Sequence, residues 1–253
     1  MPLTVPFIWN PSTRMSIKLP YKSTDIAIHP GLCTSCVYRI GYDNTNDDYK
    51  VVRIVVYLIL GFGIEYEIKV YSLRSNSWHR PEKFPHCPNW KSFGNSIVCG
   101  SLHWISTVKS EKSDLKEESL IVAFDIGTEK DRVLPQPQYR GPYYKLYVDD
   151  LGECLSLSCH YKSSTLLKEY GGTNESWLRL AQNIPVPSNH VVKSAAYSNC
   201  GKNVLLSMDD DNLVWYDLDS ESLEDPRIHA DENYSFEVET LAWKIYYDVA
   251  EAG

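Results

Sequence analysis

The strongest constraint on the fold is one kind of segment that recurs along the chain. Each copy has an alternating apolar and aromatic strand, then a turn of Asp, Ser, Asn or Gly, then a second short strand or a Trp. A period of two predicts β-strands, and the turn residues predict hairpins. One position can be aligned in four of the copies, at Tyr71, Phe124, Glu169 and Tyr216. The successive positions are 53, 45 and 47 residues apart. The copies span residues 68–80, 121–135, 165–180 and 212–226, with a weaker one at 7–20.

Further strand pairs lie between these hairpins. They are expected over residues 92–106, 146–161 and 194–210, each around a short turn. Four strands in every 45 to 50 residues are typical of the blades of a β-propeller. The sequence therefore predicts an all-β, β-propeller-like (kelch-like) domain of four-stranded blades over residues 1–250, incomplete at its N-terminus. Residues 236–247 have the composition of a closing strand, and we expect this strand to have lost its N-terminal partner.

The charge of the chain argues against several classes of partner. The net charge is −8, and residues 207–253 hold fourteen acids and two bases. Nucleic-acid binding needs Lys and Arg at the phosphates, so it is not expected.

The longest apolar run, 51–60, contains Arg53 and is too short to cross a bilayer as a helix. Seven cysteines, with no leader segment before them, favour free thiols in the cytoplasm or nucleus.

Residues with catalytic or metal-binding chemistry do not form a complete motif. Cys33 and Cys36 form a single Cys-x-x-Cys pair, whereas a zinc site needs four ligands. His79, His86 and Cys87 lie among prolines that favour an extended loop, and His103 alternates with apolar neighbours as a structural histidine does. We therefore expect no catalytic residue, metal or cofactor. The recurring Trp78, Trp104, Trp177 and Trp215 are expected to pack in the core.

Seven strings of residues carry a family resemblance. In chain order they are WNPSTR (9–14), DDYKVVRI (47–54), VYSLRSNSW (70–78), SIVCGSLHWI (96–105), IVAFDIGTEK (121–130), LKEYG with SWLRL (167–171 and 176–180) and LVWYDL (213–218). With these strings the chain resembles the F-box-associated (type 1/3) domain of plant F-box proteins. The resemblance implies a propeller that selects client proteins for a cullin-type ubiquitin ligase. Among subfamilies it is most similar to the self-incompatibility-locus F-box proteins, whose targets are pistil ribonucleases, so a basic ribonuclease is one candidate client.

The chain departs from the family pattern in three places. Only eight residues precede WNPSTR, so we expect the F-box to be absent, and with it any contact to the ligase adaptor. Thr165 and Leu166 stand where the family usually has Trp or Met. Cys99, Gly100 and Ser101 replace the usual Asn-Gly turn before the Leu-His-Trp strand.

The loops supply the candidate client-binding residues. Protein interfaces concentrate their binding energy in Tyr, Trp and Arg, which favours Tyr139, Arg140, Tyr143 and Tyr144, with Trp90 second. Acids at Asp209, Asp210 and Asp211 would steer a basic client. They lack the Gly and Glu of a calcium loop. Two alternatives stay open: a truncated, non-functional remnant with an unpaired sheet edge, and a propeller hydrolase, which needs two carboxylates facing each other across a cleft.

Overall fold

The computed structural model describes residues 6–20, 33–59, 63–81, 88–109, 117–139, 145–171, 176–186, 191–208, 212–224 and 244–247 of the 253-residue chain. Within those ranges every regular element is a β-strand. No helix there is long and apolar enough to cross a membrane. The predicted all-β class is thereby confirmed. The chain divides into two compact units, which we describe separately.

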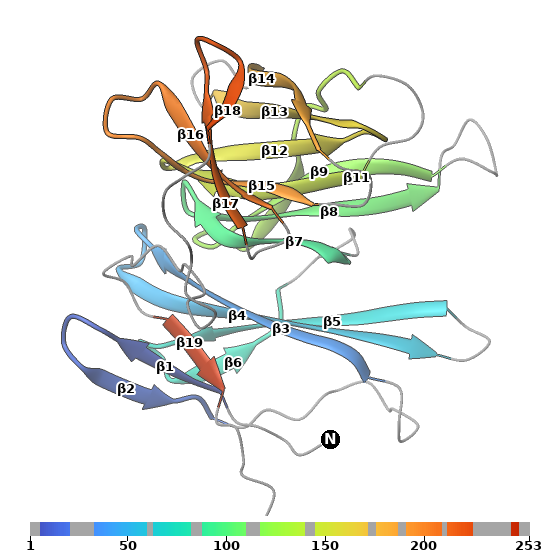
Figure 1. Cartoon of the computed structure of the whole chain (residues 1–253). Helices are drawn as coiled ribbons and strands as arrows, with labels where there is room; N and C mark the ends of the chain where they lie inside the picture. Colours follow the sequence, from blue (N-terminus) through green and yellow to red (C-terminus); the bar gives the residue numbers. More distant parts are fainter. Residues whose placement is uncertain are drawn as a thin grey trace, which may run out of the picture. The chain divides into compact units, whose positions relative to one another are not determined.

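Unit 1 contains residues 1–87, 126–130 and 237–253. Its larger sheet is an antiparallel meander in chain order, seen in blue to cyan in Figure 1: β3 (Cys33–Asp43), β4 (Asp48–Ile59), β5 (Gly63–Ser72) and β6 (Ser77–His79). Its smaller sheet has the order β19-β1-β2, formed by β19 (Lys244–Tyr247), β1 (Pro6–Asn10) and β2 (Met15–Lys18). The buried apolar run predicted after residue 50 is the single strand β4.

The strand near the C-terminus has a partner, contrary to our expectation. β19 pairs antiparallel with β1, and Pro6 lies opposite Tyr247 while Trp9 lies opposite Lys244. The expectation of a lost partner was wrong, because the residues just before the WNPSTR string, together with its first two residues, form that partner strand: β1 runs from Pro6 to Asn10.

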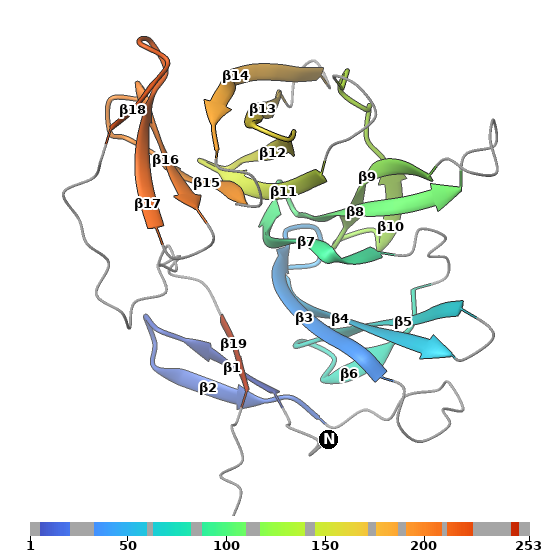
Figure 2. The same ribbon diagram turned by 45° about the vertical axis from the view of Figure 1, so that its right-hand side comes forward.

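Unit 2 contains residues 88–125 and 131–236 and holds three four-stranded meanders (Figure 2). The first is β7 (Pro88–Val98), β8 (Ser101–Lys109), β9 (Glu117–Asp125) and β10 (Lys130–Val133), of which Lys130 belongs to unit 1. The second is β11 (Lys145–Leu151), β12 (Cys154–His160), β13 (Ser164–Gly171) and β14 (Ser176–Pro185). The third is β15 (Val192–Tyr197), β16 (Asn203–Met208), β17 (Asn212–Asp217) and β18 (Ser222–Glu224).

Both faces of β12, in the middle sheet of unit 2, are buried, and its sequence shows why. Successive side chains of a strand point to opposite faces. Leu155, Leu157 and Cys159 join an apolar core with side chains of the β7–β10 sheet. The intervening Ser156 points the other way, and its hydroxyl is 2.6 Å from that of Ser194 on β15. Burial raises the pKa of Cys159 to about 12, so this thiol is a packing group.

Five hairpins share one turn. The first residue of each is Asn10, Asp43, Ser72, Asp125 or Asp217, and the residue four places later has a positive φ of 51–56°. At Asn10, Asp43 and Asp217 the side-chain oxygen accepts hydrogen bonds from the backbone N–H groups two and three residues on. This Asx-type bonding fixes the turn in addition to the backbone hydrogen bonds. The predicted loop 42–48 is therefore shorter than expected, because only residues 44–47 lie outside strands.

The register between paired strands also corrects our alignment of the repeats, by one residue in the third copy. Tyr71 lies opposite Trp78, Tyr216 opposite Leu223, and Tyr170 opposite Trp177. Tyr170, rather than Glu169, is thus the equivalent of Tyr71. Glu169 was chosen from the strand pattern alone, which does not fix which of two neighbouring residues faces the partner.

Two of the recurring tryptophans tie neighbouring sheets together. The indole N–H of Trp78 donates to the carbonyl oxygen of Pro20 (3.0 Å), and that of Trp177 donates to that of Pro135 (2.6 Å). Each proline follows a buried leucine, Leu19 or Leu134. Trp104 is fully buried, as predicted, whereas Trp78, Trp177 and Trp215 are half-buried.

Candidate functional site

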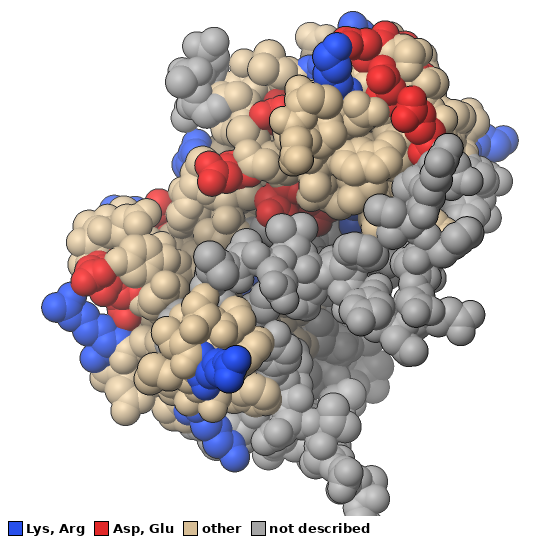
Figure 3. Space-filling model, turned by 60° about the vertical axis from the view of Figure 1, so that its left-hand side comes forward, with Lys and Arg blue, Asp and Glu red and all other residues tan. Residues whose placement is uncertain are grey.

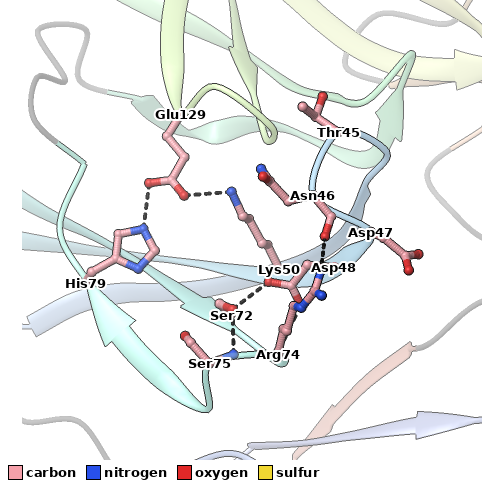
Figure 4. Close-up of a pocket in the computed structure, with 10 residues that line it drawn as sticks. All are labelled: Thr45, Asn46, Asp47, Asp48, Lys50, Ser72, Arg74, Ser75, His79 and Glu129. Carbon is pink, nitrogen blue, oxygen red and sulfur yellow. Dashed lines mark hydrogen bonds and ion pairs between the residues drawn. The ribbon is translucent and has the colours of Figure 1, made fainter.

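The candidate site is an open hollow in unit 1, of about 790 Å³, formed where three hairpin turns meet (Figure 4). We call it the turn hollow. The β3–β4 turn, the β5–β6 turn and the turn after β9 contribute to it. Its lining residues are Thr45, Asn46, Asp47, Asp48, Lys50, Ser72, Arg74, Ser75, His79 and Glu129. All are polar, so the hollow is suited to hydrogen bonding and charge pairing rather than to an apolar ligand.

Lys50 is the centre of the turn hollow. Its ammonium lies 3.0 Å from a carboxylate oxygen of Asp43 and 2.8 Å from one of Glu129. It also donates to the carbonyl oxygen of Ile126 at 2.9 Å. An ammonium has three donors, so these partners use all of them. The hydrogen bonds and charges of Glu129 and Asp43 raise the pKa of Lys50, although its burial acts in the opposite direction.

Two of the carboxylates that line the turn hollow, those of Glu129 and Asp48, are also engaged. One carboxylate oxygen of Glu129 accepts a hydrogen bond from the Lys50 ammonium. The other oxygen lies 2.7 Å from Nε2 of His79 (Figure 4). Asp48 accepts the Ser72 hydroxyl on one oxygen and the backbone N–H of Arg74 on the other. A hydrolase of the glycosidase kind needs one carboxyl to give up a proton and another to attack or activate water. Here both carboxylates hold turns in place.

The groups that remain accessible lie around the rim. Thr45, Asn46, Asp47, Arg74 and His79 are exposed. Arg74 is held by a hydrogen bond from its guanidinium to the carbonyl oxygen of Asn46 (2.7 Å). Side chains fixed in this way lose little conformational entropy when a partner binds. The turn hollow therefore offers a preorganised polar surface with donors and acceptors of both charges.

Asp43 makes the fold of this site sensitive to acid. Burial alone raises its pKa, but hydrogen bonds from Asn46 and Lys50 outweigh that effect and lower the pKa from 3.8 to about 2. A carboxyl group whose pKa is lower in the folded chain than in the unfolded chain stabilises the fold at pH values above its unfolded pKa. This stability is lost as the pH falls through the folded pKa. We expect wild-type chain to lose this contribution between about pH 4 and pH 2.

The Asp43→Asn variant should begin with lower stability at neutral pH and show a flatter pH dependence in that window. Urea unfolding midpoints, measured at a series of pH values, check this expectation. Parallel curves for the variant and the wild-type chain would contradict it.

The predicted binding residues are described only in part. Tyr139 is half-buried and packs against the apolar core between the first two sheets of unit 2, with its hydroxyl 3.5 Å from the Gln136 side-chain oxygen. Its main contacts are therefore structural. Trp90 lies in β7, but its side chain is outside the described residues. Arg140, Tyr143, Tyr144, Asp209, Asp210 and Asp211 also lie outside them. The turn hollow includes none of the predicted residues.

The sequence contained a signal for the turn hollow that we interpreted only as strand pattern. Lys50 lies in the DDYKVVRI string and Glu129 in IVAFDIGTEK. A lysine that breaks the apolar alternation of a buried strand needs a carboxylate partner, because buried charges are paired. The partner lies 79 residues further along the chain, and pattern analysis does not reach that far.

The other candidate chemical groups are described only in part, because His86 and Cys87 lie outside the described residues. His103 is buried, and burial, with a smaller effect of Arg132, lowers its pKa to about 4, as befits a structural histidine. Cys36 is an exposed cysteine on β3 that forms no disulfide, and the Cys33 side chain lies outside the described part of the chain. Among the residues described, no group of three or more His, Cys, Asp or Glu side chains is placed to hold a metal ion.

The repeated antiparallel meanders define a β-propeller domain. Residues 4–242 match the family described as the F-box associated beta propeller domain, and the chain belongs to that family. It is 32% identical to the F-box protein CPR1 of Arabidopsis thaliana, over 87% of this chain and 59% of that protein. It is 29% identical to the F-box protein At4g22390 of the same plant, over 91% of this chain and 62% of that protein.

The chain thus spans about six tenths of the length of these relatives. Among solved structures, TolB from Acinetobacter baumannii is a distant likeness, with 12% identity and a TM-score of 0.41 over 87% of this chain and 51% of that one. The narrower resemblance to self-incompatibility proteins stays a prediction.

Proposed function

We propose that this chain is the client-recognition part of an F-box protein, and that the turn hollow is one of its contact surfaces. Membership of the F-box associated family supports a role in binding a protein for ubiquitination. The rim of the turn hollow supports this location for the contact surface, because its exposed polar groups are fixed by buried ion pairs. A rigid polar rim around a shallow hollow is suited to a protein surface, where hydrogen bonds and charge complementarity give specificity.

The charge of the surface supports a basic client. Exposed acids follow β17, at Asp219, Glu221 and Glu224. Figure 3 shows acidic side chains gathered near the upper edge of the face drawn there. A cationic client would associate faster with such a surface, and salt would weaken this effect. A basic ribonuclease is one client of this kind, and the cytosol or nucleus, where described thiols such as Cys36 and Cys200 would stay reduced, is the compartment we propose.

Charge reversal at Arg74 tests the turn hollow. We expect the wild-type chain to capture a client from plant cells and to bind it directly when both are purified. Arg74→Glu should weaken that binding about tenfold or more, because the fixed guanidinium of Arg74 donates hydrogen bonds that a carboxylate cannot donate, even though the added negative charge alone would favour a basic client. Titration of the purified pair by isothermal calorimetry measures the change.

Arg14→Glu is the matched control. Arg14 is an exposed arginine in the equivalent β1–β2 turn, and its position is occupied by Glu129 and Glu221 in two other turns, so the substitution suits the backbone. Equal loss of binding in both variants would show a general charge effect and would count against the turn hollow. A purified client that binds neither the wild-type chain nor the control would overturn the client role itself.

A further inference from the structure

The outer strand of the middle sheet in unit 2 is unlike the other outer strands. β6, β10 and β18, each the last strand of its meander, have three, four and three residues. β14 has ten and lies at the end of the order β11-β12-β13-β14. An edge strand presents backbone N–H and C=O groups that pair readily with another chain, and proteins usually keep such edges short. A long outer strand is therefore a candidate surface for strand addition.

Only the first half of β14 has the regular geometry that a partner strand needs. From Ser176 to Arg179 the strand pairs with β13 without a shift in register. The register then shifts twice between Thr165 and Lys168 of β13, and Asn183 has a φ of 56°. Bulges and unusual backbone angles block further pairing. The usable edge is residues 176–179, because Leu180 lies in the register shift, and four residues are within the usual range of strand lengths.

Two cations lie directly opposite each other on one face of this edge. Lys168 of β13 pairs with Arg179 of β14 in the register. The Arg179 guanidinium donates to the neutral side chain of Gln182 at 2.9 Å. In the described part of the chain, neither cation lies within salt-bridge distance of a carboxylate. Like charges directly opposite in a sheet are destabilising. An added anionic strand would remove that penalty.

The other face of the same edge is apolar and exposed. Leu178 has 58% of its surface exposed, the largest fraction among the exposed large apolar side chains of the described residues. Its cross-strand neighbour, Glu169, is half-buried and accepts the Tyr197 hydroxyl at 2.6 Å. One face of the edge is therefore cationic and the other offers a leucine. An incoming strand that alternates acidic and apolar residues complements both faces, because its side chains point alternately to the two sides.

We propose that residues 176–179 of β14 bind an extended client segment in which acidic and apolar residues alternate, adding a fifth strand to the sheet. The backbone hydrogen bonds provide affinity and the alternate side chains provide specificity, as in other cases of strand addition. This inference rests on the proposed client role and names the chemistry of one client segment. It is compatible with a basic client, because only the docked segment needs to be acidic.

A labelled peptide tests this edge without any client. The probe is a fluorescein-labelled peptide of about ten residues, matching β14 in length, that alternates Glu and Val. Fluorescence anisotropy should show saturable binding to the full chain, weakened by salt. Lys168→Glu should weaken it about tenfold or more. The same change turns two opposed cations into an opposed ion pair, so the Tm should not fall and misfolding is excluded as the cause.

Lys162→Glu is the control, since Lys162 is an exposed lysine just before β13 and should bind the probe as wild type does. Equal binding by all three chains would overturn the proposal. So would the absence of saturable binding, or a preference for the matching Lys–Val peptide. Because the assay contains no client, a negative result leaves the client role standing, and a failed search for a client leaves this assay fully interpretable.

Discussion

Replacing Lys50 by Met should lower the free energy of unfolding by about 3–5 kcal/mol, the range for breaking a buried ion pair by removing one partner. Met fills much of the space of the lysine stem, so the loss is electrostatic. Asp43, which is 1% exposed, would keep its charge without the ammonium 3.0 Å away. The carbonyl oxygen of Ile126 would also lose its donor. Urea unfolding at neutral pH measures the change.

Lys162→Met is the matched control, because Lys162 is exposed and surface substitutions of this kind change stability by less than about 0.5 kcal/mol. A loss below about 1 kcal/mol for Lys50→Met would contradict our account. It would mean that Asp43 and Glu129 find other donors once Lys50 is gone, and that the turn hollow does not depend on this ammonium.

Replacing Trp104 by Ala should lower the free energy of unfolding by about 3–5 kcal/mol through a different mechanism, the cavity left by a large buried side chain. Trp104 is fully buried on β8, and its cross-strand neighbour Val122 is buried as well. A well-packed core closes such a cavity only partly. Thermal unfolding followed by near-ultraviolet circular dichroism measures both the shift in Tm and the loss of packing.

Trp78→Phe is the informative comparison, because it keeps an aromatic ring but removes the pyrrole part of the indole, with the N–H that donates to Pro20. A single hydrogen bond of this kind is worth about 1 kcal/mol. Equal losses in the free energy of unfolding for Trp104→Ala and Trp78→Phe would contradict the distinction between a core tryptophan and one that links neighbouring sheets.

The local sequence pattern was sufficient to predict the strands but not to predict the turn hollow. The strand–turn–strand segments carry their own periodicity and turn residues, so the meanders could be predicted from short stretches such as 68–80. The register within a pair is set by neighbours across the sheet, which is why Glu169 was chosen in place of Tyr170. The same limit hid the turn hollow, whose charges come from three separate turns and meet only in the folded chain.

Residue type alone sets a second limit. Tyr139 was chosen because tyrosine is common at interfaces, and its half-buried ring also packs against an apolar core, so its contact with a client stays a prediction. Composition does not separate these roles. The exposure of Leu178 and the opposed cations at Lys168 and Arg179 are likewise invisible until the strands are paired.

The pairing of β1 with β19 bears on how the chain is made. Residues 6–9 pair with residues 244–247, so the three-stranded sheet cannot form until the ribosome has synthesised residue 247. Contacts so distant in sequence raise contact order, which slows folding. During that delay the nascent β1 edge is open to other chains, and co-translational chaperones would then have their greatest effect on yield at this step.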